Sequence, residues 1–235
     1  MEKKKKKRIL LGVLAFVLLA GIAGAGAVYY YLFAPQFHPQ KTTYVYIDRD
    51  DTADSIYNKV KTLGKPNSFI GFKWMAQWRK YPRNIHTGRY AIRPGENVYH
   101  VFSRFYRGYQ EPMNLTIGSV RTLDKLARSV GRQLMIDSAE IAGVMNDSLF
   151  QQKLGYNKET IACLFIPETY QVYWDMSVDD FFKRMQKEHQ KFWTQERLNK
   201  ARTIGMTPEE VCTLASIVEE ETNDNPEKPV VAGLY

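Results

Sequence analysis

The sequence has little cysteine and little histidine, with two and four residues of each among 235. It has no P-loop, HExxH, CxxC or GxSxG motif, and no glycine-rich dinucleotide pattern follows a predicted strand. The absence of these motifs argues against the common classes of nucleotide-binding protein, zinc protease, thioredoxin-like protein and α/β-hydrolase. Because the histidines are scattered, we predict neither a metal site nor a cofactor.

The net positive charge of the chain is small outside one short segment. The net charge is +8, and residues 1–8 contribute five of those units through five lysines, one arginine and one glutamate. The remaining chain carries only +3 and shows no basic stripe. A nucleic-acid partner is therefore not expected.

One long apolar run, residues 9–33, follows the basic tail and contains no charged side chain. Its 25 residues are enough for a membrane-spanning helix, and the tyrosines at 29–31 are typical of an interfacial aromatic belt. Ala23-Gly24-Ala25 resembles a signal-peptide cleavage site, but the apolar run continues beyond an ordinary signal sequence. We therefore predict a single-pass inner-membrane anchor, with residues 1–8 cytoplasmic and the main part periplasmic.

The part outside the membrane is predicted to be α+β. Residues 34–43 contain two prolines and are expected to form a linker. Three strands are predicted at 44–48, 89–92 and 113–117, each followed by a helix and a closing glycine. With an amphipathic helix at 68–81, the first two units give a β-α-α-β order, which resembles a LysM-type module. We assign residues 44–117 to this LysM-like module, and the resemblance implies a glycan-facing role.

Several aromatic side chains of this module are candidates for stacking on sugars. They are Trp74, Trp78, Tyr90 and Tyr106. The alternative, that they fill a small core, is favoured for most of them.

Residues 118–235 are predicted to be mainly helical, and the best-signalled helix begins at Thr207. Pro208 suits the first helical position and Glu210 completes a capping box. Apolar residues then recur at helical spacing and predict one buried stripe: Val211, Leu214, Ala215, Val218 and Thr222. Glu219, Glu220 and Glu221 crowd the negative end of this helix, which its dipole disfavours. Carboxylates are unfavourable at this end of a helix, and the neighbouring sequence shows no charge that compensates for them. Such a position is a candidate functional site.

The carboxylate pair Glu219 and Glu221 cannot act across one scissile bond, because residues two apart on a helix do not face each other. A two-carboxylate glycosidase would need a partner from elsewhere in the chain. A single carboxyl kept protonated by partial burial could instead donate a proton to the leaving oxygen and then accept one from an internal hydroxyl. In murein, the C6 hydroxyl of the muramyl sugar would then close a 1,6-anhydro ring.

Two segments carry a more specific resemblance. Residues 215–222 (ASIVEEET), followed by 231–235 (VAGLY), and residues 164–170 (LFIPETY) resemble signatures of the MltG (YceG-like) endolytic murein transglycosylases. The resemblance implies that Glu219 is the catalytic acid and then the base, with Glu221 and Ser216 in support. A surface role for Glu221 and a packing role for Ser216 are the alternatives. Glu220 is expected to be solvated.

The resemblance also carries departures. Ala162 and Cys163 replace a Glu-Gly pair that commonly precedes the Phe-Pro stretch. Members of the family continue beyond the position where this chain ends, so we expect a truncated form whose catalytic domain, residues 118–235, is incomplete.

Three functions remain open at this point. The first is an endolytic lytic transglycosylase that cleaves the MurNAc–GlcNAc β-1,4 bond of nascent peptidoglycan strands, with cell-wall synthases as partners. The second is a membrane-anchored, non-catalytic peptidoglycan-binding or scaffold protein. The third is a glycoside hydrolase that uses water. The sequence leaves open whether Cys163 and Cys212 form a disulfide, although the exported side would permit one.

Overall fold

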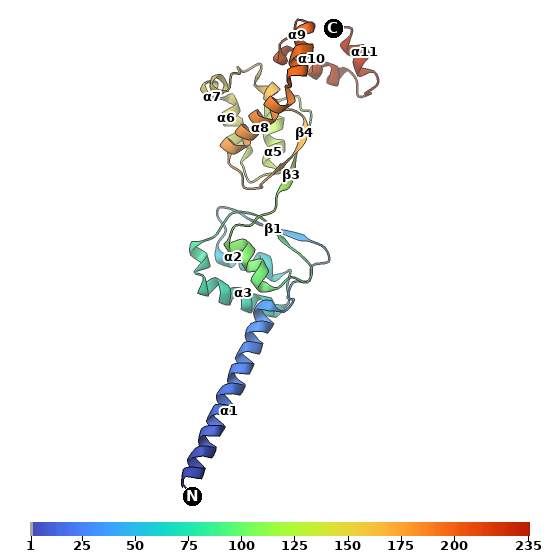
Figure 1. Ribbon diagram of the computed structural model, residues 1–235. Coiled ribbons are helices and arrows are strands. Elements are labelled where there is room, and N and C mark those ends of the chain that lie inside the picture. The colour runs from blue at the N-terminus through green and yellow to red at the C-terminus, as the bar shows by residue number, and fades with distance from the viewer. Residues whose placement is uncertain (1) are drawn as a thin grey trace. The chain divides into compact units, whose positions relative to one another are not determined.

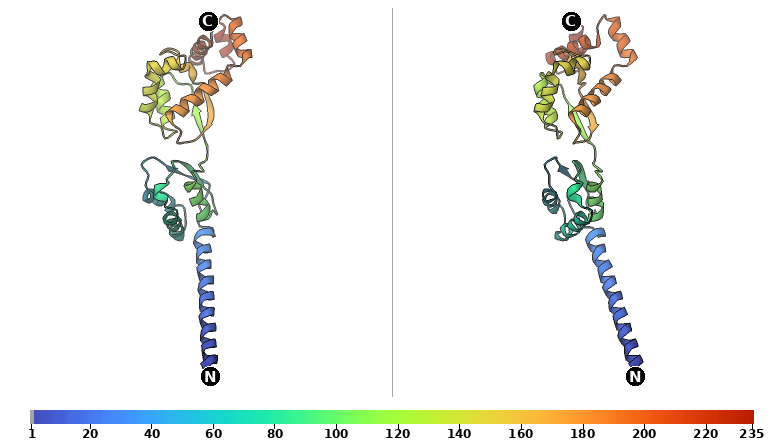
Figure 2. Two further views of the ribbon diagram at one scale, coloured as in Figure 1. Left: turned by 60° about the vertical axis from the view of Figure 1, so that its left-hand side comes forward. Right: turned by 90° about the vertical axis from the view of Figure 1, so that its left-hand side faces the viewer.

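The computed structural model describes residues 2–235, with side chains described from residue 5 onward. The contacts divide the chain into two compact units, residues 1–112 and 113–235, and each is described by itself. Figures 1 and 2 show helices and short strands in both, so the predicted mixture of the two is confirmed.

Unit 1 begins with the long apolar helix. Helix α1 (Glu2–Val28) runs into a π-helical turn η1 (Tyr29–Phe33). Among residues 2–235, the stretch Lys5–Phe33 is the one helix that is long and apolar enough to cross a membrane, and none of its most apolar window is buried by protein. The predicted membrane-spanning length is therefore present.

The folded part of unit 1 has the predicted β-α-α-β order and one additional helix. Strands β1 and β2 are antiparallel, with Thr43 opposite Ile92, and Phe72 meets Tyr57, Tyr81, Phe102 and Phe105 edge to face in the core. The elements are β1 (Thr43–Ile47), α2 (Ala53–Lys61), α3 (Pro66–Trp78), η2 (Tyr81–Arg83), β2 (Gly88–Ile92) and α4 (Val98–Tyr106).

The segment 34–43, predicted to be a linker, is instead part of this unit. Phe37 is completely buried in the core, and it forms an isolated bridge with Gly64. Pro35 forms a second bridge with Asn97. The burial of this aromatic side chain therefore fastens the segment after α1 and η1 to the folded part.

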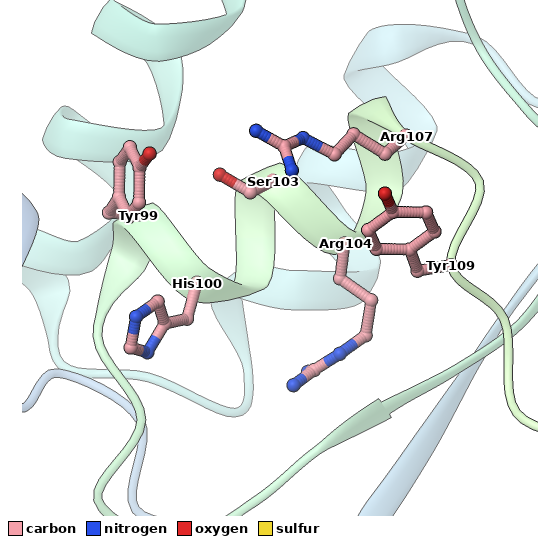
Figure 3. Close-up of a pocket in the computed structure, with 6 residues that line it drawn as sticks. All are labelled: Tyr99, His100, Ser103, Arg104, Arg107 and Tyr109. Carbon is pink, nitrogen blue, oxygen red and sulfur yellow. The ribbon is translucent and has the colours of Figure 1, made fainter.

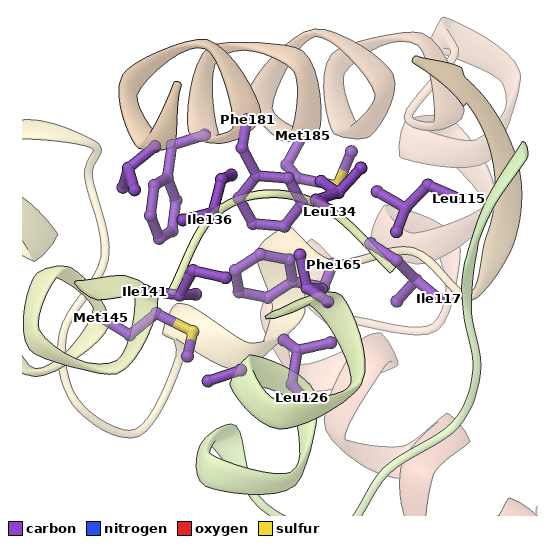
Figure 4. Packing of buried hydrophobic residues seen from close by; sticks show 14 of the residues in the cluster. Leu115, Ile117, Leu126, Leu134, Ile136, Ile141, Met145, Phe165, Phe181 and Met185 are labelled. Atoms are coloured by element: carbon purple, nitrogen blue, oxygen red, sulfur yellow. The ribbon is translucent and has the colours of Figure 1, made fainter. Parts of the chain in front are cut away.

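Unit 2 starts at residue 113, five residues before the predicted start of the catalytic domain at residue 118. Strand β3 (Met113–Ile117), which we had placed in the LysM-like module, pairs antiparallel with β4 (Glu168–Val172), so the module does not include it. Its inward residues Leu115 and Ile117 enter the core shown in Figure 4. The helical elements up to the end of that core are α5 (Leu123–Gly131), α6 (Ser138–Asn146), α7 (Ser148–Lys153), η3 (Ile161–Leu164) and α8 (Val178–Phe192).

Three helices follow, and they lie together at the C-terminal end of unit 2 (Figures 1 and 2). They are α9 (Gln195–Thr203), which the sequence did not reveal, α10 (Pro208–Glu221) and α11 (Lys228–Ala232). Of the residues that form the described core of unit 2, the last is Met185. The predicted buried stripe of α10 is therefore wrong in extent, because only Val218 is buried and Ala215 is exposed.

Candidate active site at the end of helix α10

The sequence defines both ends of helix α10. The Thr207 hydroxyl accepts a hydrogen bond from the Glu210 backbone N–H at 3.2 Å, and the Glu210 carboxylate accepts one from the Thr207 N–H at 2.8 Å. This is the predicted capping box, with Pro208 at the first helical position. Thr222 is extended and ends the helix, so the three glutamates occupy its last turn.

Each of these glutamates has a partner, which corrects the expectation of uncompensated charge. Glu219 Oε2 pairs with Lys228 Nζ at 2.5 Å. Glu220, expected to be solvated, forms an ion pair with Arg121. The two cations offset the unfavourable position of these carboxylates at the negative end of the helix.

Glu221 faces a different neighbour, in agreement with the helical geometry. Its Oε1 lies 3.5 Å from the Tyr235 hydroxyl, a long and weak hydrogen bond. The Ser216 hydroxyl donates to the Cys212 carbonyl at 2.9 Å, one turn back along the helix. No hydrogen bond given for these residues joins Glu219 to Glu221 or Ser216, so the supporting roles of the latter two stay predictions.

A short turn brings Lys228 back onto Glu219. The Thr222 hydroxyl donates to Glu227 Oε2 at 2.8 Å and accepts from the Asp224 N–H at 3.0 Å. This turn reverses the chain, so that the first residue of α11 lies against the last turn of α10. Sequence reasoning missed Lys228, because its contact depends on a turn and not on helical spacing.

Arg121 was also missed, since it precedes α5 and lies far from α10 in the sequence. Its hydrogen bond to Glu220 raises the pKa of the guanidinium above its ordinary value. After the pair of Glu219 with Lys228, this is the second ion pair in the last turn of α10. No local sequence signal could have paired residues that are 99 positions apart.

The Glu219 side chain is 44% exposed, so the partial burial that we expected for a general acid is not present. The exposure leaves the carboxyl accessible to a large polymer. Lys228 occupies the Oε2 atom of this carboxyl, so another group can reach that atom only when the ion pair opens. The last turn of α10 thus presents an accessible carboxyl group that is held in an ion pair.

The N-terminal half of α10 rests on a half-buried cluster of polar groups. Cys163 Sγ lies 3.8 Å from the Glu209 carbonyl, and both cysteines are free. The hydrogen bond between the two thiols lowers the pKa of Cys163 and raises that of Cys212. Nearby, burial raises the pKa of Tyr156 to about 12 and lowers that of His189. These contacts fix α10 against η3.

A hollow in unit 1 is a separate feature. It encloses about 270 Å³ along one face of α4, and Figure 3 shows its lining. The lining is aromatic and basic and carries no carboxylate: Tyr99, His100, Ser103, Arg104, Arg107 and Tyr109. It therefore has no carboxyl group for the role expected of Glu219.

No cluster of three or more histidine, cysteine, aspartate or glutamate side chains that could hold a metal is found among residues 2–235.

Comparisons with known proteins place the chain in a family. A search of curated proteins finds no match. A solved structure of a YceG-like protein from Listeria monocytogenes is similar over 81% of this chain and 67% of that one, with 19% identity and a TM-score of 0.48. The family model described as the YceG-like family matches residues 45–235, which include helix α10 and Glu219. The chain therefore belongs to the YceG-like family, the family of MltG.

Proposed function

We propose that this protein is an endolytic murein lytic transglycosylase and that Glu219 is its catalytic residue. The observation that carries the proposal is an exposed glutamate at the end of α10, within a segment that matches the YceG-like family. Its substrate is the MurNAc–GlcNAc β-1,4 bond of nascent glycan strands. Helix α1 anchors the protein in the inner membrane, with the folded units in the periplasm beside the cell-wall synthases.

The reaction needs one carboxyl and no water. Protonated Glu219 donates its proton to the glycosidic oxygen while the bond from the muramyl C1 to that oxygen breaks. The resulting carboxylate then takes the proton of the C6 hydroxyl, and O6 bonds to C1 to form the 1,6-anhydro ring. The proton returned to Glu219 restores the starting state.

The surroundings of Glu219 assign roles to its neighbours. Lys228 pairs with the ionised carboxyl when no glycan is bound; substrate displaces it, and the carboxyl takes up one proton from solvent before the first turnover. Glu221 and Ser216 orient the last turn of α10. The β1-α2-α3-β2 part of unit 1 acts as the LysM-like, glycan-facing module.

The test is a comparison of two matched substitutions, Glu219→Gln and Glu220→Gln. Both carboxyls sit in the last turn of α10, both are in ion pairs and both are 44% exposed. Purified murein is digested with the full chain in detergent, and the new glycan ends are identified by mass spectrometry. We expect Glu219→Gln to lower anhydro-end formation by about 100-fold or more and Glu220→Gln to retain it.

Other outcomes would select other functions. Reducing ends in place of anhydro ends indicate a hydrolase that uses water. Murein binding without cleavage by the unaltered chain indicates a scaffold protein. Unchanged cleavage by the Glu219→Gln variant would remove Glu219 from the mechanism.

A further inference from the structure

The outward face of α3 carries large apolar side chains that unit 1 leaves partly or mostly exposed. Trp74 is 45% exposed and Trp78 is 72% exposed, and Ile70 is also exposed. Four-residue spacing places these three side chains on one side of the helix. The opposite side of α3 is apolar as well and enters the core through Phe72 and Met75.

This helix is fastened to the end of the membrane segment. Asn67 Nδ2 donates to the Tyr30 hydroxyl at 2.9 Å, and the rings of Tyr31 and Trp74 meet edge to face at 5.1 Å. A Cβ atom on Gly71 would lie only 2.2 Å from the Tyr31 carbonyl oxygen, so the two backbones touch. Figure 1 shows α3 lying where α1 ends.

The length of the apolar run places this junction at the membrane surface. With Arg8 at the cytoplasmic side and a rise of about 1.5 Å per residue, residue 29 lies roughly 30 Å beyond residue 9. That distance equals the thickness of a typical hydrocarbon core, which is about 30 Å. Tyr29–Phe33 therefore lie in the headgroup layer on the far side, and Trp74 touches Tyr31 there.

The charge of this part of the chain suits an anionic surface. The expectation that no basic stretch lies outside the N-terminal tail needs correction, because no acidic residue occurs from Ser55 to Gly95, whereas that stretch contains nine lysines and arginines. Lys73 lies on α3 beside Trp74, and the Arg79 guanidinium lies 4.7 Å from the centre of the Trp78 ring. Tryptophan with lysine or arginine is the combination that favours a bilayer interface.

We propose that the outward face of α3, with Ile70, Lys73, Trp74, Trp78 and Arg79, lies on the phospholipid surface and contacts anionic headgroups. The indoles occupy the headgroup layer and the two cations pair with lipid phosphates. This contact fixes the orientation of unit 1 on the membrane. The inference depends on the membrane anchorage that is part of the proposed function.

The experiment measures how far Trp78 reaches into lipid. The full chain, with Trp74, Trp174 and Trp193 changed to Phe, is reconstituted in vesicles of phosphatidylcholine and phosphatidylglycerol brominated high on the acyl chains. We expect bromine to quench Trp78 fluorescence and the emission to shift to shorter wavelength. Removing one cation by Lys73→Gln should lower the ratio of docked to undocked protein about fivefold.

The matched control moves the reporter to strand β1. Tyr46→Trp, with all four natural tryptophans changed to Phe, places an exposed indole on strand β1, away from the outward face of α3. We expect little quenching of this reporter. Equal quenching of both reporters, or none of Trp78, would overturn the proposal, as would Trp78 emission that responds to soluble murein fragments and not to lipid.

Failure of the anchor can be recognised separately. If α1 does not span the bilayer, the protein will leave the vesicles on alkaline extraction. A chain that resists extraction but shows an unquenched Trp78 would refute the contact of α3 alone. Loss of murein cleavage by Glu219→Gln would be unaffected by either result.

Discussion

The ion pair between Glu96 and Arg104 offers the sharpest test of how unit 1 is held together. Arg104 reaches Glu96 with both terminal nitrogens, at 2.6 and 3.0 Å, and both side chains are only about 15% exposed. The Glu96 backbone carbonyl also accepts from the N–H groups of Gln36 and Phe37. Glu96 therefore joins α4 to the segment that follows the membrane helix.

Glu96→Gln would leave Arg104 buried without its counter-ion. Removing one member of a buried pair costs about 3–5 kcal/mol, and the residual exposure here reduces our expectation to about 2–3 kcal/mol. The matched control is Glu111→Gln. Glu111 pairs with Arg93, but the two side chains are 29% and 45% exposed, so its loss should cost less than about 1 kcal/mol.

Hydrogen exchange of the full chain in detergent measures the effect where it occurs. Peptides from β2 and α4 should lose protection by roughly 30- to 150-fold in Glu96→Gln, which corresponds to about 2–3 kcal/mol. Peptides from unit 2 provide an internal reference and should not change. Equal effects of the two substitutions would refute the argument from burial.

The pH dependence gives an independent check. Burial by itself raises the pKa of Glu96, but the hydrogen bonds and charges of Arg104 and Arg93 together outweigh it and bring the pKa below its ordinary value of 4.5. A lowered pKa in the folded state stabilises unit 1 above pH 4.5, and this stabilisation is lost as the pH falls through the folded-state pKa. The difference between the unaltered chain and Glu96→Gln should therefore shrink below pH 4.5. A difference that persists in acid would show that the charge is not its cause.

Two further predictions concern helix α10. Lys228→Gln removes the ion pair that holds Glu219, and because an exposed pair is worth about 0.2–1 kcal/mol, kcat/KM for murein should rise by up to about fivefold. A fall in kcat/KM would show that Lys228 assists the reaction. Iodoacetamide near neutral pH should label Cys163 before Cys212, because their mutual hydrogen bond lowers the first pKa and raises the second. Peptide mass spectrometry reads the order, and equal labelling would contradict it.

Local signals in the sequence predicted most of the secondary structure. Thr207 caps a helix that begins at the next residue, as its capping box predicted. The strand expected at 113–117 has those bounds in the structure. Caps and alternation depend on neighbouring residues, which is why they can be read without the fold.

Pairing between distant segments could not be predicted in this way. β3 has the pattern of a strand that could pair on either side, and only the structure shows that β4 is its partner. The same limit applies to the site, where helical geometry separated Glu219 from Glu221 but gave no indication of Lys228 or Arg121. Their contacts depend on a turn and on tertiary packing.

Helices α10 and α3 differ most from expectation, and they show what apolar periodicity can and cannot predict. A repeat of apolar residues indicates that one face of a helix is removed from water, but it does not identify what covers that face. Helix α3 is apolar on both sides, and protein covers only the side with Phe72. Tyr90, also a candidate for sugar stacking, is completely buried, whereas Trp74 and Trp78 are not. A helix with one face in the core and a second apolar face beside a membrane anchor is therefore best explained by two apolar phases, the protein interior and the bilayer interface.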